Sequence, residues 1–181
     1  EIDAVAARGA GVVICPSTEA NLGDGLPDLP RWLAGGVPLA IGSDSQVGRD
    51  ALEELRWLDY GQRLARRERN VAAAPGHETS TAARLVERVR SGGAAAAGFA
   101  RWGFERGARA DLLVADPGCD ALHGLPPGAL LDALVFASPV RPWRDVMVAG
   151  RWAIRAHEAP LQAAVAEAFG RAMRELWETE A

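Results

Sequence analysis

The stretch that decides the fold is VPLAIGSDSQVG, residues 37–48. Its apolar residues lead into Gly-Ser-Asp-Ser, which is typical of a short buried strand that ends by presenting Asp44. A second buried strand is predicted at residues 10–15, AGVVIC. Helices are predicted at residues 2–9 and at RWLAGG, residues 31–36, which Gly35 or Gly36 would close. Strands separated by helices indicate parallel βα units, and therefore an α/β fold.

The remaining elements are read from the same kinds of pattern. Asp50 predicts the N-cap of a long helix over residues 51–68. Its Leu52, Leu55 and Leu58 recur at helical spacing, with Trp57, Tyr60 and Leu64 on an adjoining stripe. A Gly- and Pro-rich loop is expected at 16–30. Further predictions are helices at 79 or 80–90, 94–100, 128–137 and 160–177, and strands at 108–116 and 145–156, the last with a turn at Gly150.

Composition narrows the class of protein. The chain has 181 residues, of which 49% are hydrophobic and 24% are charged, as in globular domains. Its net charge of −4 offers no basic surface to nucleic acid or to an anionic membrane, so a small molecule is the expected partner. No apolar run is long enough to span a membrane, and no signal pattern opens the chain. The two cysteines, Cys15 and Cys119, have no metal-ligand spacing; one disulfide is compatible with them, but no disulfide framework is, so we expect a cytoplasmic protein.

Polar side chains follow both buried strands of the first half. Thr18, Glu19 and Asn21 come after one strand, and Asp44, Ser45 and Gln46 come after the other. The carboxyl ends of parallel strands share one edge, where active sites of α/β proteins lie. A rigidly held carboxylate there can bind a metal or move a proton. The alternative is that Asp44 only forms a turn or caps a helix.

Histidine adds little to this picture. His77, His123 and His157 show neither of the HxH and HxxxH spacings that bind metals. Each is predicted to be a surface residue.

Longer motifs carry a family resemblance. The segment ICPSTEANLGDGLPDLPRWLAGGVPLAIGSDSQV, followed by EELRWLDYGQRLARRERN, closely resembles the C-terminal part of the formimidoylglutamate deiminases, a family of the amidohydrolase superfamily. The downstream RGARADLLVAD and VMVAGRWAIRA look like the segment by which the chain of such enzymes passes from their (β/α)₈ barrel back to a small β-domain beside it. The resemblance covers essentially the whole chain.

The resemblance implies a fold and a set of roles. The fold would be the C-terminal portion of a metal-dependent (β/α)₈ barrel at residues 1–105, strands of a small β-sandwich-like domain with an inserted helix at 106–157, and a C-terminal helix at 158–181. Asp44 would be both a metal ligand and the proton shuttle. The metal would be one divalent ion, Zn²⁺, and the reaction would release ammonia from N-formimino-L-glutamate in histidine degradation. The other substrate-binding candidates are Thr18, Glu19, Asn21, Ser45 and Gln46.

The family's other metal ligands, an HxH and further histidines, are missing from this sequence. The sequence also has no initiator Met and no N-cap before its first helix, so we expect a fragment. We expect the fragment alone to bind no catalytic metal and to be inactive, and the full-length protein to be a homodimer.

Two other interpretations stay open. One is a ring deaminase of the same superfamily, although ring deaminases more often have P-x-S-N where this chain has PSTEANLGDG. The other is a truncated paralogue without catalytic activity.

Overall fold

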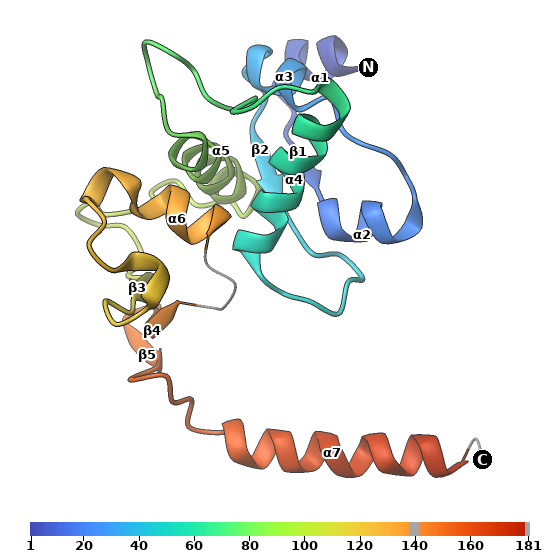
Figure 1. Cartoon of the computed structure of the whole chain (residues 1–181), viewed down its shortest axis with the longest axis vertical. Coiled ribbons are helices and arrows are strands. Elements are labelled where there is room, and N and C mark those ends of the chain that lie inside the picture. The colour runs from blue at the N-terminus through green and yellow to red at the C-terminus, as the bar shows by residue number, and fades with distance from the viewer. Residues whose placement is uncertain (138–141, 180–181) are drawn as a thin grey trace.

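The structure, a computed structural model, describes residues 1–137 and 142–179 (Figure 1). The first half alternates short strands with helices, and the second half adds a small antiparallel sheet and a long terminal helix. The elements are, in chain order, α1 (Ile2–Ala7), β1 (Val12–Ile14), α2 (Pro16–Leu22), α3 (Leu29–Ala34), β2 (Leu39–Ile41), α4 (Ala51–Arg66), α5 (Thr81–Ala96), β3 (Leu112–Ala115), α6 (Leu130–Phe136), β4 (Trp143–Val148), β5 (Arg151–Ile154) and α7 (Gln162–Thr179). Two short 3₁₀ turns, Asp120–Leu122 and Pro127–Ala129, precede α6.

The two predicted buried strands form a parallel pair. β1 and β2 are in register from Val12 opposite Leu39 to Ile14 opposite Ile41. Ile14 and Leu39 are almost completely buried. The parallel βα arrangement is therefore confirmed for this part of the chain, and both strands end at the same edge.

The prediction of a loop at residues 16–30 is wrong in part, because Pro16–Leu22 form helix α2. Pro16 occupies the first helical position, where its missing N–H costs nothing, and Gly23 ends the helix in the left-handed conformation at φ 76°. Proline and glycine are typical of loops, but at these two positions they delimit a short helix.

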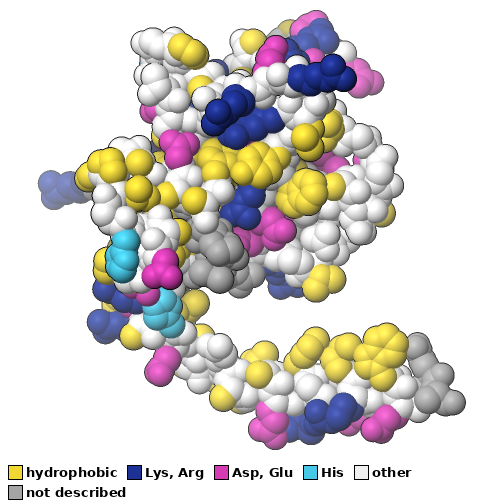
Figure 2. Space-filling view, in the orientation of Figure 1, with side chains coloured by type: hydrophobic (Ala, Val, Ile, Leu, Met, Phe, Trp, Pro, Cys, Tyr) yellow, Lys and Arg dark blue, Asp and Glu magenta, His cyan; other side chains and the backbone are white. Residues whose placement is uncertain are grey.

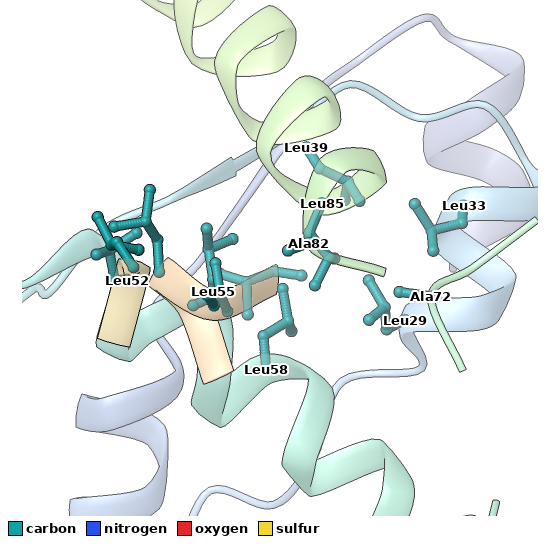
Figure 3. Packing of buried hydrophobic residues seen from close by; sticks show 14 residues of the cluster. Leu29, Leu33, Leu39, Leu52, Leu55, Leu58, Ala72, Ala82 and Leu85 are labelled. Carbon is teal, nitrogen blue, oxygen red and sulfur yellow. The ribbon is translucent and has the colours of Figure 1, made fainter. Parts of the chain in front are cut away.

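Helix α4 begins at its predicted cap, because the Asp50 side chain accepts a hydrogen bond from the Leu52 backbone N–H at 2.9 Å. Its leucine stripe faces the core (Figure 3), where leucines and alanines of α3, α5 and β2 surround it. The adjoining stripe instead lies at the surface, with exposed fractions of 48% for Trp57 and 79% for Leu64.

Helix α5 is one continuous helix, whereas two were expected. Ser80 caps it by accepting a hydrogen bond from the Ala83 N–H. The helix continues through Gly92 and Gly93. A Cβ atom at Gly92 would lie 2.0 Å from the Leu39 carbonyl oxygen, so the missing side chain lets α5 pack directly on β2.

The second half forms an antiparallel sheet in the order β3-β4-β5, and Gly150 makes the predicted turn between β4 and β5 with φ 79°. Helix α6 lies between β3 and β4 in the sequence and packs on α4 and α5, where its residues Ala133, Leu134 and Val135 are buried. The division of the chain at residues 105 and 157 stays a prediction.

Helix α7 lies apart from the rest of the described chain (Figure 1), and its residues are largely exposed. Within residues 1–137 and 142–179, no helix combines the length and apolar character that a membrane crossing requires.

Candidate active site

The candidate site lies where β1 and β2 end. Helix α2 starts two residues after β1, and the loop that carries Asp44 follows β2. Asp44 is exposed and has a left-handed backbone, with φ 49°. The sequence-based expectation that both polar segments lie at one edge agrees with this arrangement.

Two hydrogen bonds connect these segments. The Thr18 hydroxyl donates to the Ser43 carbonyl oxygen at 2.7 Å, and the Gln46 amide donates to the Ser17 carbonyl oxygen at 3.5 Å. Thr18 is buried, so its side chain joins the two segments instead of facing solvent. The Asp44 loop is consequently held against the first turn of α2.

Glu19 lies beside the end of β1. Its carboxylate accepts a hydrogen bond from the Cys15 backbone N–H at 2.9 Å, which connects it to the residue just before α2. Burial raises the pKa of the Cys15 thiol, and the negative charges of Asp44, Glu19 and Glu54 raise it further. Three carboxylates therefore surround Cys15, which disfavours an additional negative charge at this point.

Glu54 was not singled out from the sequence, although it is the most deeply buried carboxylate of this region. It lies in the first turns of α4, and its two oxygens accept hydrogen bonds from Ser17, one from the backbone N–H at 2.9 Å and one from the hydroxyl. The surrounding EELRW pattern is that of an ordinary amphipathic helix. The only sequence signal was a carboxylate on the core-facing side of that helix, next to Leu55 and Leu58.

A pocket of about 450 Å³ opens between α2 and the start of α4. Two predicted substrate-binding residues, Asn21 and Gln46, line it. Its other lining residues are Ser17, Ala20, Gly48, Glu53, Glu54 and Trp57. Ser45, like Asp44, is exposed on the loop after β2. Glu19 lines a smaller and mainly apolar pocket of about 140 Å³, which also has Trp57 in its lining.

The metal-binding capacity of this site is limited by its donors. No group of three His, Cys, Asp or Glu side chains in the described residues is placed to hold a metal ion. A catalytic zinc needs about three protein ligands. Asp44 could supply one carboxylate, so residues 1–137 and 142–179 do not make up a zinc site by themselves.

The histidines lie at the surface, away from the Asp44 loop. His77, His123 and His157 are all exposed, as predicted. His157 pairs with Asp116 at 2.9 Å in the second half of the chain. Both cysteines are free thiols.

Comparison with known proteins identifies the family. Residues 1–153 match the amidohydrolase family. The chain belongs to the amidohydrolase family. It is also 43% identical over 176 residues to the formimidoylglutamate deiminase of Pseudomonas aeruginosa. The aligned region covers 97% of this chain and 39% of that protein.

Two solved structures superpose closely on the chain. An amidohydrolase from Brucella melitensis is 36% identical and superposes with a TM-score of 0.87 over 97% of this chain and 38% of its own. An adenosine deaminase from Xanthomonas campestris with bound zinc is 27% identical, with a TM-score of 0.82 over 98% of this chain and 40% of its own. The chain thus spans about two fifths of the length of the relatives that it matches.

Proposed function

We propose that this chain is the C-terminal part of a formimidoylglutamate deiminase, a hydrolase that converts N-formimino-L-glutamate and water to N-formyl-L-glutamate and ammonia. The observation that carries the proposal is the 43% identity to the Pseudomonas aeruginosa deiminase over nearly the whole chain. The whole reaction belongs to the full-length protein.

In this proposal Asp44 is the residue that moves protons. A carboxylate at the end of a buried strand is held rigidly, yet Asp44 is exposed and can reach water. It would accept a proton as water attacks the formimino carbon and would then pass a proton to the departing nitrogen. The C–N bond breaks with its electron pair on nitrogen while the added hydroxyl loses its proton and forms the formyl C=O bond, and ammonia leaves. Asn21 and Gln46, which line the larger pocket, would bind substrate beside it.

We also propose that Asp44 is one ligand of a divalent metal ion, zinc, whose remaining ligands lie outside residues 1–181. The zinc-bound deaminase from Xanthomonas campestris supports this choice of metal. The metal would supply an activated water molecule at neutral pH. Homodimerisation of the full-length enzyme and a cytoplasmic location stay predictions.

The test compares Asp44→Asn with Asp24→Asn in the full-length enzyme. Asp24 is a matched control, because it is an exposed carboxylate in the loop that follows α2. Loss of a proton-transferring group typically lowers kcat by about 10²–10⁴-fold. We expect that loss for Asp44→Asn and none for Asp24→Asn, with ammonia release as the assay. Unaltered turnover in Asp44→Asn would show that Asp44 has no catalytic role.

A second candidate function is deamination of a nucleoside or nucleobase ring. It is favoured by the 27% identity to the Xanthomonas campestris adenosine deaminase. A substrate panel of formiminoglutamate, adenosine, guanine and cytosine separates the two. We expect kcat/KM to be highest for formiminoglutamate, and a higher value for any ring substrate would overturn the deiminase proposal.

A further inference from the structure

Glu54 is a buried carboxylate whose two oxygens both accept hydrogen bonds from Ser17. Its exposed fraction is 4%. One oxygen accepts the Ser17 N–H at 2.9 Å and the other accepts the Ser17 hydroxyl. Hydrogen bonds to an ionised acceptor are about twice as strong as neutral ones. Glu54 therefore fixes the position of Ser17, 37 residues earlier in the chain, relative to α4.

Ser17 is linked to Asp44 through its neighbour in the sequence. Thr18 donates to the Ser43 carbonyl at 2.7 Å, and Ser43 directly precedes Asp44. Asp44 has φ 49°, a left-handed conformation that costs an L-residue about 1–2 kcal/mol. Such a conformation persists where surrounding contacts hold the backbone. The contacts with α2 are of this kind.

We propose that Glu54 is a positioning residue for Asp44. By fixing Ser17, it holds the first turn of α2 in place, and Thr18 of that turn holds the backbone from which the Asp44 carboxylate projects. The proposal rests on the function proposed above, since it assigns Glu54 a role in the geometry of that reaction. It does not require Glu54 to touch substrate.

The variants separate hydrogen bonding from charge. Glu54→Gln keeps the side-chain length, because its carbonyl can accept the Ser17 N–H and its amide can donate to the Ser17 hydroxyl. Glu54→Ala leaves a buried N–H without its partner. Ser17→Ala removes only the hydroxyl bond. Glu68→Ala is the control, since Glu68 is an exposed carboxylate just after the C-terminal end of α4 and lines neither pocket.

The kinetic experiment measures kcat and KM of these variants in the full-length enzyme. A misplacement of about 1 Å can cost about 10²-fold in rate. We expect kcat to fall by about 10-fold or more in Glu54→Ala and by less in Ser17→Ala, with little change in KM. Glu54→Gln and Glu68→Ala should keep nearly the wild-type kcat. A Glu54→Ala enzyme that unfolds more easily but keeps its kcat would reduce Glu54 to a structural role, and a Glu54→Gln enzyme as slow as Glu54→Ala would exclude positioning by hydrogen bonds.

A second measurement does not depend on activity. The Gln46 N–H donates to the Ser43 carbonyl at 2.9 Å, within the loop that carries Asp44. Hydrogen exchange of the 181-residue chain should show faster exchange at Gln46 in Glu54→Ala and no change in Glu68→Ala. Unchanged exchange in Glu54→Ala would overturn the inference even if the enzyme is a deiminase. Faster exchange together with an inactive wild-type enzyme would support the link between Glu54 and the loop while refuting the proposed function.

Discussion

Gly92 offers the sharpest test of how α5 is placed against β2. A Cβ atom there would lie 2.0 Å from the Leu39 carbonyl oxygen and 2.6 Å from the Leu39 nitrogen. Ordinary van der Waals contact begins at about 3.4 Å. Gly92→Ala therefore requires α5 and β2 to separate by more than 1 Å, and only backbone atoms can move. Because β2 leads into the Asp44 loop, this packing also positions the candidate site.

The magnitude follows from two opposing effects. Overpacking a buried contact costs about 1–3 kcal/mol and occasionally more, and a contact with backbone belongs at the upper end of that range. Alanine is preferred over glycine in a helix by about 1 kcal/mol. We therefore expect Gly92→Ala to lower the free energy of unfolding by about 2 kcal/mol, which corresponds to about 4–8 °C in Tm for a chain of this size.

The neighbouring glycine is the matched control. A Cβ atom at Gly93 would have no atom within 4 Å, so Gly93→Ala has only the helix preference to gain. It should raise the free energy of unfolding by about 1 kcal/mol. Urea denaturation followed by circular dichroism measures both variants. A Gly92→Ala protein as stable as wild type, with an unchanged dependence on urea, would refute the close packing of α5 on β2.

Two more predictions concern the second half of the chain. Hydrogen bonds from the Gly118 N–H and from His157 lower the pKa of Asp116. The stability that these bonds provide is complete above the unfolded-state pKa of about 3.9. It is lost as the pH falls through the folded-state pKa of Asp116, which is lower. Urea denaturation between about pH 3 and pH 7 should thus show Asp116→Asn less stable than wild type at neutral pH, with a gap that closes below about pH 4; a gap that stays constant with pH would contradict this. Helix α7 carries an exposed apolar row that includes Val165, Phe169 and Trp177, opposite its charged side (Figure 2). Phe169→Glu should therefore reduce self-association in analytical ultracentrifugation without lowering the unfolding midpoint. Glu167→Gln, on the charged side, should change neither self-association nor the midpoint. A lower midpoint in Phe169→Glu would mean that this face packs on the rest of the chain.

Local sequence signals predicted a large part of this fold. The apolar segments around Ile14 and Leu39 predicted the parallel strands, because strands buried on both faces are typically short and apolar throughout. Asp50 predicted one helix start, and Thr79 or Ser80 predicted another that proves to be Ser80, because a side chain that accepts a backbone N–H acts within three residues. The family was also evident from the sequence, since the motifs around Asp44 lie in a chain that matches a known deiminase over 97% of its length.

The sequence by itself thus determined most of the element types, the two strand ends and the position of Asp44 after one of them, but not helix α2 or the continuity of α5. Tertiary structure decided which side chains meet at that edge. The missing side chain of Gly92 lets α5 pack directly against Leu39 of β2. Glu54 forms hydrogen bonds with Ser17, which lies 37 residues earlier in the sequence. Caps and periodicity depend on neighbours within one or two turns, whereas these contacts depend on how α2, α4 and the strands pack together, and that packing has no local signature in the sequence.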